Sequence, residues 1–460
     1  MSGVFGIYSP TVTDVATETY QALYALQHRG QESCGIAVNN QGDINVHKDL
    51  GLVPDVFTQQ IMESLGQGQI AIGHVLYAKH TVKRSDAQPL VVRHIKGNMA
   101  LAYNGALTNA KSLRESLELS GAIFQTTNDS EVIAYEITSA RLEVDAIEKA
   151  VESAMYKIQG AYSLVLMSPK KLIAARDPQG FRPLSIGKMG DCTLVSSETC
   201  AFDSLGAEFI RDIEPGEIVI IDENGLQSIR THCGQKTSQC VFEFVYFARP
   251  DSVIDHASVH NARLRAGAYL ALEHPVQADV VIGVPDSGLD AALGYARQSG
   301  IPYGVGFIKN RYVGRTFIQP TQRQREKAVR IKLNVLKATV AGKRVILIDD
   351  SIVRGTTSKR IVNILREAGA TEVHMRISAP PFINPCYFGT DIDSRDKLIA
   401  CRMSEVEIAD NIGVDSLGFL SVDSIEHVAE GATCDFCTGC VTGQYPVPVP
   451  AEDELDKAKF

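Results

Sequence analysis

The sequence contains no long run of basic residues, no apolar run of about 18 residues, and no internal repeat or low-complexity tract. Without a basic run, and with a formal net charge of −9, nucleic acid is an unexpected partner, although a local anion pocket stays compatible with this charge. The missing apolar run predicts that no helix crosses a membrane. No basic segment followed by an apolar one opens the chain, so we expect no signal peptide and predict a cytoplasmic protein.

Ten cysteines are nevertheless present, and disulfides do not account for them, because thiols stay reduced in the cytoplasm. Six of them can be ordinary buried residues, since free cysteine packs as a small hydrophobe. Cys437 and Cys440 form a C-x-x-C pair that Cys434 precedes. Taken alone, this spacing is compatible with a zinc site or a redox pair.

The length of 460 residues predicts two to three domains, and the 45% share of hydrophobic residues is ordinary for a globular protein. Short strands fill the first ~230 residues, and NNQG and DENG between them are turn signals typical of hairpins. Helices are expected over Thr13–Leu26 and within Asp129–Ile158, where apolar residues recur with helical spacing. This pattern predicts an α+β domain with stacked sheets.

From about Val280 the pattern changes to short buried strands that alternate with helices. The expected strands are VVIGVP, YGVGFI, VILIDD and EVHMRIS, and the helices LDAALGYARQSG and TTSKRIVNILREAG each end at or near a glycine. Such alternation predicts a parallel, doubly wound sheet. The tail VPVPAEDELDKAKF is punctuated by proline and then acidic, so we expect it to be loosely held.

The segment VILIDDSIVRGTTSKR carries the strongest functional signal. A buried strand ends in Asp349 and Asp350, and a short loop then leads into a helix. Backbone N–H groups, the positive end of the helix and the hydroxyls of Ser351, Thr356 and Thr357 together suit a phosphomonoester. The two acids suit ribose hydroxyls, or Mg²⁺ held through water. A plain strand, turn and capped helix would not need two acids after a buried strand.

This segment resembles the phosphoribosyl-pyrophosphate (PRPP) motif of type I phosphoribosyltransferases, and KNRYVGRTFIQP closely resembles one family, the amidophosphoribosyltransferases of purine synthesis. The resemblance includes QHRGQES, FVYFARPDS and VPDSG, and it extends from Gly3 to about Tyr445. It implies displacement of pyrophosphate from PRPP by ammonia, with Mg²⁺ as cofactor, purine nucleotides as effectors and a homotetramer as the assembly. The resemblance implies that the ribose-phosphate end of PRPP is bound by Asp349, Asp350, Arg354, Gly355, Thr356 and Thr357. It implies that pyrophosphate is bound by Asp286, Ser287, Lys309 and Arg315, the last two in a basic stretch expected to close over the polyanion.

The resemblance also implies that the chain is divided into two domains and a tail. They are an N-terminal-nucleophile (αββα) glutaminase-like domain at 2–235, a type I phosphoribosyltransferase domain at 236–430, and a cluster-binding tail at 431–460. Many bacterial members of the family hold a [4Fe–4S] cluster on four cysteines. The matching positions are Cys240, Cys386, Cys437 and Cys440, with Cys434 as a substitute ligand. The implied role of this cluster is structural, because its ligands would pin the tail to both domains.

The glutaminase half departs from the family pattern at its reactive positions. Family members begin C-G-V-F-G-I, and the thiol of that cysteine attacks glutamine with its own α-amine as base. Ser2 stands at this position, and a hydroxyl is a much weaker nucleophile near neutral pH. The family reads G-H-x-R-Y-x-T where this chain reads GHVLYAK. Leu76 therefore replaces the arginine that holds the glutamine carboxylate, and Lys79 supplies a point charge without the fork of an arginine.

The other glutaminase positions match. Asn104 and Gly105 match the oxyanion-hole pair, Asp129 matches the residue that binds the substrate α-amine, and Arg29 is kept. We therefore predict a phosphoribosyltransferase beside a glutaminase that hydrolyses glutamine poorly. Three alternatives stay open: another amine as acceptor, a non-catalytic sensor of PRPP or nucleotides, and a near-ordinary enzyme in which Ser2 keeps weak glutaminase activity. The intact DDSIVRGTT segment and the basic stretch argue against the sensor.

Overall fold

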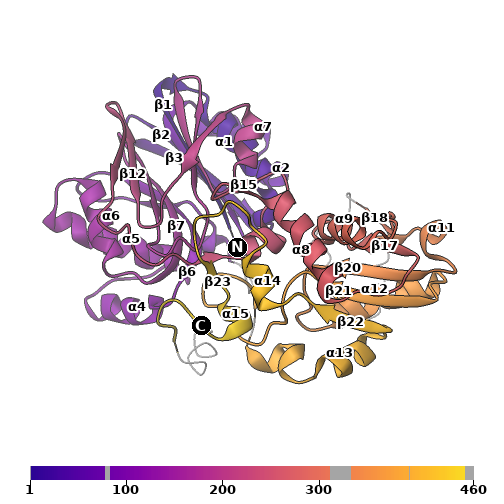
Figure 1. Ribbon diagram of the computed structural model, residues 1–460. Helices are drawn as coiled ribbons and strands as arrows, with labels where there is room; N and C mark the ends of the chain where they lie inside the picture. Colours follow the sequence, from indigo (N-terminus) through magenta and orange to yellow (C-terminus); the bar gives the residue numbers. More distant parts are fainter. Residues whose placement is uncertain (1, 78–82, 311–332, 393, 451–460) are drawn as a thin grey trace.

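The computed structural model describes residues 2–77, 83–310, 333–392 and 394–450, and it places them in two joined halves (Figure 1). The first half is built from antiparallel sheets and the second from a parallel sheet with helices on both faces. Lys79, Arg315 and the last ten residues of the tail lie outside the described residues. None of the helices in the described part of the chain combines the length and the apolar character that a membrane crossing requires.

A seven-stranded antiparallel sheet forms one layer of the first half. Its strand order is β11-β9-β10-β1-β4-β2-β3, which makes β1 the central strand. The strands are β1 (Gly3–Thr13), β2 (Ser33–Asn40), β3 (Asp43–Leu50), β4 (Gly68–Leu76), β9 (Ser185–Met189), β10 (Cys192–Ser196) and β11 (Glu208–Asp212). Because β1 pairs with β4 on one side and β10 on the other, the start of the chain is fixed inside the sheet.

A six-stranded antiparallel sheet forms the second layer, in the order β13-β12-β8-β7-β6-β5. Its strands are β5 (Leu90–Val92), β6 (Met99–Leu107), β7 (Gly160–Met167), β8 (Leu172–Arg176), β12 (Ile218–Asp222) and β13 (Gly225–Ile229). Alternating residues of both sheets meet in one apolar core between them, which includes Val4, Ile72, Ala102 and Val165. The predicted turns NNQG and DENG close the β2–β3 and β12–β13 hairpins.

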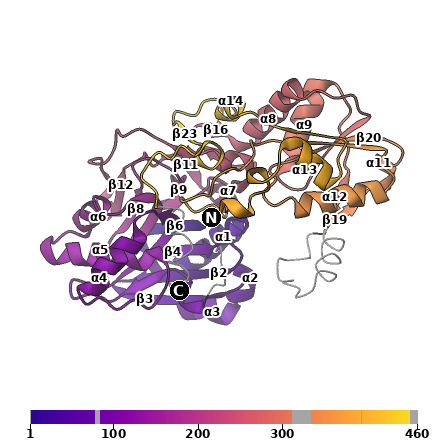
Figure 2. The same ribbon diagram turned by 90° about the horizontal axis from the view of Figure 1, so that it is seen from below.

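Helices cover the outer faces of both sheets. The helices on the first sheet are α1 (Val15–Ala25), α2 (Val53–Val56), α3 (Gln59–Leu65) and α7 (Cys200–Leu205), and those on the second sheet are α5 (Asp129–Glu143) and α6 (Ile147–Met155), with α4 (Ala110–Leu119) beside α5. Figure 2 shows α4, α5 and α6 on one side of the strands and α2 and α3 on the other. Asp14 and Asn128 start α1 and α5 by accepting from backbone N–H groups of the first turn. The predicted αββα architecture and both helical ranges are confirmed.

The second half is centred on a four-stranded parallel sheet in the order β17-β20-β21-β22. These strands are β17 (Val280–Gly283), β20 (Arg344–Asp349), β21 (Glu372–Ile377) and β22 (Ser416–Phe419). On one face lie α8 (Val259–Glu273) and α9 (Gly288–Ser299), and on the other lie α12 (Thr356–Glu367) and α13 (Glu405–Ile412). Because β17 and β20 are parallel neighbours, the turn after β17 and the loop after β20 meet at one edge of the sheet.

One strand prediction was wrong in this half. YGVGFI was expected to be a buried strand of the parallel sheet, but its first part makes only a single bridge, between Tyr303 and Val281. The strand that follows is β18 (Phe307–Lys309), which pairs in a separate antiparallel hairpin with β19 (Leu333–Val335). The two glycines explain the difference: a Cβ atom on Gly306 would lie 2.5 Å from Ile282, so this stretch crosses over β17 at close range.

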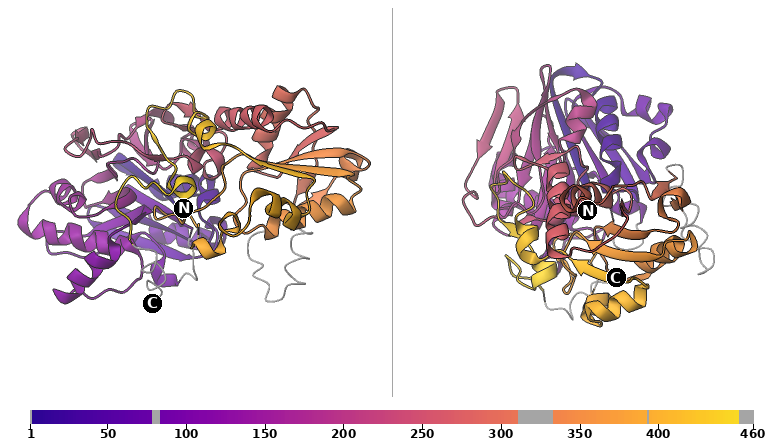
Figure 3. Two further views of the ribbon diagram at one scale, coloured as in Figure 1. Left: turned by 60° about the horizontal axis from the view of Figure 1, so that its bottom comes forward. Right: turned by 45° about the vertical axis from the view of Figure 1, so that its right-hand side comes forward.

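The end of the chain returns to the first half. There β23 (Phe436–Cys437) pairs in parallel with β14 (Gln239–Cys240), so that Cys240 and Cys437 are register partners. Tyr445, Val447 and Val449 pack against a buried cluster in the same region that includes Phe181 and Phe388. Figure 3 shows this yellow segment running across the first half. The remaining short elements are η1 (Gln27–Arg29), η2 (Arg84–Asp86), η3 (Glu243–Phe247), β15 (Val253–Ile254), β16 (Ala257–Ser258), α11 (Lys337–Val340), η4 (Arg395–Lys397), η5 (Ile399–Cys401), α14 (Val422–Glu426) and α15 (Gly439–Thr442).

We predict that Gly267→Ala destabilises the second half. A Cβ atom at Gly267 in α8 would lie 1.8 Å from the carbonyl oxygen of Ala291 in α9, so the two helices would have to separate. We expect a loss of about 1–3 kcal/mol, larger than the gain in helix propensity. Leu272→Ala, on the exposed side of the same helix, is the control and should change stability by no more than about 0.5 kcal/mol. Thermal unfolding followed by circular dichroism measures both, and equal melting temperatures would contradict the prediction.

Candidate functional site

Two acidic residues at the end of β20 lie beside the turn after β17. Asp349 and Asp350 are each only 8% exposed. The backbone N–H of Asp350 donates to Asp349 Oδ1 at 2.9 Å, and the hydroxyls of Ser287 and Ser351 donate to the carboxylate of Asp350. The residues predicted from two separate sequence segments therefore meet at one point, at the carboxyl edge of the parallel sheet.

Burial and mutual repulsion set the charge state of this pair. Burial, and next the neighbouring charge of Asp350, hold the pKa of Asp349 well above its usual range. Burial also raises the pKa of Asp350, although the Ser287 and Ser351 hydroxyls and the charge of Arg263 oppose this effect. A hard cation, or the hydroxyl groups of a sugar, would stabilise the ionised pair.

A cavity of about 680 Å³ opens in front of the acidic pair. Its wall includes eight of the predicted residues: Ser287, Asp349, Asp350, Ser351, Arg354, Gly355, Thr356 and Thr357. The loop ends at Gly355, which has a φ of +77°, and α12 begins at the next residue with its N-terminus at the cavity. A side chain at Gly355 would also meet Ile399 at 2.7 Å, so the tight entry to the helix requires glycine. Free backbone N–H groups and hydroxyls of this kind suit a phosphate group.

A second cavity, of about 370 Å³, adjoins the first and extends to the other half of the chain. Asp286 and Lys309 line it and form an ion pair with each other. They lie together with Arg263 from α8 and with His28 and Gln31 from the first half. The predicted pyrophosphate residues are thus divided, since Ser287 lines both cavities whereas Asp286 and Lys309 line the second.

Three aromatic residues that we did not predict line both cavities. They are Tyr77, from the segment after β4, and Tyr246 and Phe247, from η3. The backbone N–H of Tyr77 lies 3.5 Å from Ser2 Oγ, and its hydroxyl lies 3.4 Å from Asp391. Tyr77 therefore stands between Ser2 and the cavity in front of the acidic pair. YFARPDS was noticed in the sequence as a motif, but nothing in it indicated that its aromatic residues face a cavity.

Ser2 is buried at the start of β1, against β6. Its backbone nitrogen donates to Asn104 Oδ1 at 3.0 Å. The amide nitrogen of Asn104 is itself buried and has no hydrogen-bond partner among the described residues. Gly105 follows with a φ of +153°, and a Cβ atom there would lie 1.9 Å from the carbonyl oxygen of Ala161. An unpartnered donor beside Ser2 fits the geometry of an oxyanion site.

Leu76 lies next to Ser2, where the family pattern has an arginine. The register of β1 and β4 pairs Gly3 with Val75, which sets Leu76 opposite Ser2, and the leucine is 6% exposed. Asp129 begins α5 and reaches back to the same strand as Asn104, because it accepts from the backbone N–H of Leu107 at 2.9 Å. Burial raises the pKa of Asp129, although that hydrogen bond opposes the effect.

Arg29, which we predict to bind substrate, contacts other protein groups and also lines the second cavity. Its guanidinium is fully buried, and Nε donates to the carbonyl oxygen of Ser2 at 2.9 Å. Nη1 and Nη2 donate to the two oxygens of Glu243 at 3.0 Å each, and Nη1 also donates to Glu198 at 2.5 Å. With its donors used in this way, Arg29 positions Ser2 and joins the first half to η3. Sequence reasoning missed Glu243 because the partner of Arg29 lies 214 residues away.

The four predicted cluster ligands surround one small cavity. Cys240, Cys386, Cys437 and Cys440 line it together with Phe181, Phe242, Phe388, Thr390 and Tyr445. Burial raises the pKa of the Cys240, Cys437 and Cys440 thiols, and for Cys440 the neighbouring cysteines add to this effect. The Phe388 N–H donates to Cys386 Sγ at 3.4 Å. The cavity measures about 10 Å³, and no three His, Cys, Asp or Glu side chains of the described residues are set at metal-ligand geometry, so the thiols would have to spread around a larger group.

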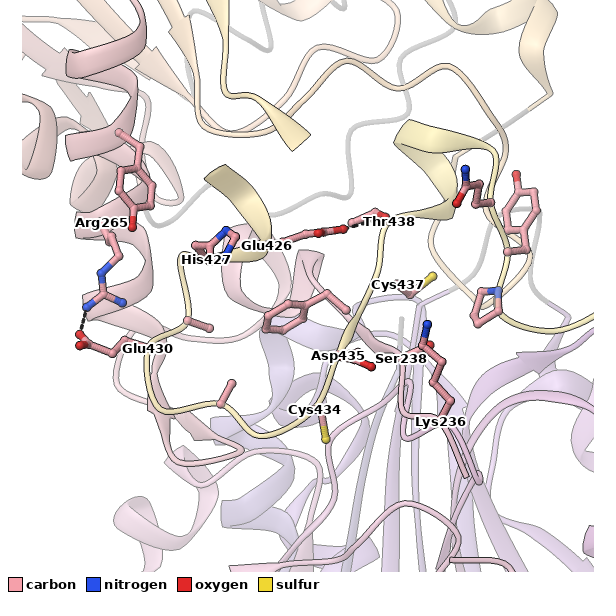
Figure 4. Close-up of a pocket in the computed structure, with 17 residues that line it drawn as sticks. Lys236, Ser238, Arg265, Glu426, His427, Glu430, Cys434, Asp435, Cys437 and Thr438 are labelled. Carbon is pink, nitrogen blue, oxygen red and sulfur yellow. Dashed lines mark hydrogen bonds and ion pairs between the residues drawn. The ribbon is translucent and has the colours of Figure 1, made fainter. Parts of the chain in front are cut away.

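Cys434 belongs to a different surface. It lines a polar groove of about 940 Å³ between the C-terminal segment, α8 and the segment before β14. Figure 4 shows the sulfur atoms of Cys434 and Cys437 pointing in different directions. The backbone N–H of Cys434 donates to Asp255 at 2.7 Å, which holds the residue away from the four-cysteine cavity. Cys434 is therefore poorly placed as a substitute ligand.

Fold and site together define a phosphoribosyltransferase joined to a domain of the glutamine amidotransferase type. Two family models match in the same order: a glutamine amidotransferase domain over residues 77–204, and a phosphoribosyl transferase domain over residues 259–379.

The chain belongs to the amidophosphoribosyltransferase family. It is 48% identical to the amidophosphoribosyltransferase of Methanocaldococcus jannaschii over 99% of this chain and 100% of the relative, and 51% identical to that of Synechocystis over 100% and 93%. A solved structure of glutamine PRPP amidotransferase from Bacillus subtilis, complexed with ADP and GMP, matches with a TM-score of 0.90 at 47% identity, over 97% of this chain and 98% of that chain. The predicted family, fold class and enzyme class, a phosphoribosyltransferase, are confirmed.

We predict that Asp349→Asn lowers kcat/KM for PRPP while it leaves the unliganded protein as stable or more stable. The amide keeps an acceptor for the Asp350 N–H but removes half of the repelling charge, and the lost charge-assisted contact is worth about 1.5–3 kcal/mol, roughly tenfold to hundredfold in rate. Because the folded pKa of Asp349 is raised, the folded protein retains a proton to a higher pH than the unfolded chain, and wild-type stability falls as the pH rises through this range. In the variant, stability should therefore depend less on pH over this range.

Thermal unfolding across pH without Mg²⁺, together with steady-state kinetics, measures both effects. Asp279→Asn is the matched control. Asp279 precedes β17 and pairs with Arg344 at the start of β20, at the opposite edge of the sheet from the acidic pair. A variant that loses stability and activity in parallel would contradict the assignment, since this would mean that Asp349 supports only the fold.

Proposed function

We propose that this chain transfers the phosphoribosyl group of PRPP to ammonia and that its glutaminase half contributes little ammonia from glutamine. The observation that carries this proposal is the pair Ser2 and Leu76, side by side at the start of β1 and the end of β4. A hydroxyl stands where a thiol nucleophile is needed, and an apolar side chain stands where a carboxylate clamp is needed. In the second half, by contrast, the residues predicted for the acidic pair and the phosphate loop all line one cavity.

The chemistry at the second half would be displacement of pyrophosphate from the anomeric carbon. The N-terminus of α12 and the hydroxyls of Thr356 and Thr357 would hold the 5-phosphate, and Asp349 and Asp350 the ribose hydroxyls or water-bound Mg²⁺. Mg²⁺, when bound, supplies positive charge to the leaving pyrophosphate. Lys309 would exchange its ion pair with Asp286 for a contact to the pyrophosphate oxygens.

A second candidate function keeps the same PRPP chemistry with another amine as acceptor. The observation in its favour is again Leu76, because a buried leucine beside Ser2 suits a less polar ligand than glutamine.

We further propose that residues 2–235 and 236–430 form the two domains and that residues 431–460 form the tail. We also propose that the protein is a homotetramer, that purine nucleotides are its effectors and that it is located in the cytoplasm. The B. subtilis relative, complexed with ADP and GMP, supports the effectors.

Pyrophosphate release tests the proposed function directly. The protein, purified without oxygen, is given PRPP and Mg²⁺ with either ammonium or glutamine. Release is expected with ammonium. With glutamine, the activation free energy should exceed that of a complete site by at least the ~1.5–3 kcal/mol of a lost charged contact, so kcat/KM should be correspondingly lower. Equal turnover with both donors would show that Ser2 is a competent nucleophile. PRPP binding without release in either case would favour another amine.

Restoring the two family residues provides the matched test. The double variant Ser2→Cys, Leu76→Arg should gain glutamine-dependent release, with the ammonium rate as internal reference. Leu76→Met in the Ser2→Cys background is the control, because it keeps the volume and the apolar character of the site without the fork. If this control gains as much as the arginine variant, the carboxylate clamp is not what the site lacks.

We also propose that Cys240, Cys386, Cys437 and Cys440 hold a [4Fe–4S] cluster. Four buried thiols that converge on one cavity from three segments supply the required donor set. The cluster, when bound, would supply a cross-link between β14, the loop after β21 and the tail. Zinc is the alternative on the same ligands.

Metal analysis of the anaerobic protein distinguishes these outcomes. We expect about four iron and four sulfide per chain, and loss of both in Cys437→Ser or Cys440→Ser. Cys434→Ser is the matched control and should keep its iron, because Cys434 does not line the four-cysteine cavity and its backbone N–H donates to Asp255. Stoichiometric zinc without sulfide would contradict the cluster, and loss of iron in the Cys434 variant would contradict the ligand set.

A further inference from the structure

Arg182 lies at the wall of the cysteine cavity, and the proposed transfer chemistry does not use it. Its side chain is fully buried and is the largest such side chain in the described part of the protein. Nη2 donates to the carbonyl oxygen of Phe388 and lies 3.4 Å from Thr390 Oγ1. Since Phe388 and Thr390 both line the four-cysteine cavity, the guanidinium is one layer behind the thiols.

The protein balances the charge of this guanidinium incompletely. Nη1 lies 3.4 Å from Glu243 Oε1, and Nε is buried without a hydrogen-bond partner among the described residues. Glu243 is a shared partner, because both of its oxygens accept shorter bonds from Arg29. A buried positive charge with one shared carboxylate is costly unless a further negative group lies nearby.

The cavity would supply that negative group. An iron–sulfur cluster on four thiolates carries net negative charge, and charges near it alter its reduction potential. We propose that Arg182 is the buried counter-charge and positioning residue for the cluster, and that it ties the occupied cavity to the backbone of Ser2 through Glu243 and Arg29. This inference rests on the cluster proposed above and assigns the residue that couples it to the first half.

Two contacts carry the coupling to the start of the chain. In the first, Glu243 holds Arg29, and Arg29 Nε donates to the carbonyl oxygen of Ser2 at 2.9 Å. In the second, the loop that begins at Cys386 packs on the oxyanion pair, since a Cβ atom on Gly389 would lie 3.1 Å from the carbonyl oxygen of Gly105. A change in the cavity therefore reaches both Ser2 and Gly105 through buried groups with little room to adjust.

The sign of two charge changes tests the counter-charge role. Arg182→Met removes a positive charge beside the cluster, so it should lower the midpoint potential. Glu243→Gln removes a negative charge while keeping its shape, so it should raise the potential. We expect at least a tenfold change in the reduction equilibrium for each, about 59 mV for one electron. Arg182→Lys keeps the positive charge, so its midpoint potential should stay close to that of the wild type. The readouts are iron and sulfide content and an anaerobic redox titration of the full-length chain.

Each result decides between distinct conclusions. Opposite shifts with rescue by lysine support the proposal, because a merely structural role gives no such dependence on sign. Unchanged potentials in iron-loaded variants, or shifts of the same sign in both, overturn it and leave the cluster in place. An Arg182→Met chain that takes up no iron, while Arg182→Lys takes up iron normally, supports the counter-charge. Wild-type protein that takes up no iron under reconstitution overturns the cluster proposal and this inference together.

Hydrogen exchange tests the coupling without any activity measurement. Removal of iron from the wild type should speed exchange at least tenfold in the peptide that begins at Ser2 and includes the start of β1. In Arg182→Met, the iron-loaded and iron-free chains should differ much less in this peptide. The matched internal control is β21 in the centre of the parallel sheet, which lies outside both contacts. Equal protection of the β1 peptide with and without iron in the wild type would overturn the coupling.

Discussion

The bidentate ion pair between Arg29 and Glu243 is the interaction on which the arrangement of the two halves depends. Arg29 belongs to the first half and Glu243 to η3 at the start of the second, and both side chains are fully buried. Removal of one partner from such a pair leaves an unpaired buried charge, which typically costs about 3–5 kcal/mol. The same arginine holds Ser2, and the same glutamate contacts Arg182 beside the cysteines. The position of Ser2, the seam between the halves and the cysteine cavity are therefore set by a single buried network.

That network explains how the first half can carry Ser2 and Leu76 at these two positions and keep its structure. Asn104 pairs with the Ser2 backbone, Arg29 pairs with Glu243, and Gly105 accommodates the loop at Gly389, so each supports the packing as well as any chemistry. Tyr77 likewise belongs to the wall of the cavity in front of Asp349 and Asp350. Replacing Arg29, Gly105 or Tyr77 would disturb contacts to the second half, whereas the side chains of Ser2 and Leu76 can change without breaking the buried ion pairs.

Local patterns made the grouping of the residues around the cavity at the end of β20 predictable from the sequence. Asp349, Asp350, Thr356 and Thr357 are close in the chain, and a buried strand followed by a loop and helix leaves them little freedom of placement. The hairpins at NNQG and DENG were equally local. By contrast, the positions of Tyr77 and Arg182 depend on partners hundreds of residues away, such as Asp391 and Phe388. YGVGFI was misassigned because composition favours a strand there, while the crossing over Ile282 admits only glycine.

The physical cost of an arginine at position 76 gives a reason for the leucine. A guanidinium at this buried position would need a carboxylate partner, and in a glutaminase the substrate provides it only while bound. A chain that no longer binds glutamine would bear that desolvation cost permanently. A leucine instead gains from burial, about 1.5–3 kcal/mol for a side chain of its size. A leucine at this position would therefore favour stability in a chain that does not bind glutamine, as expected for the proposed transferase that takes its ammonia from another source.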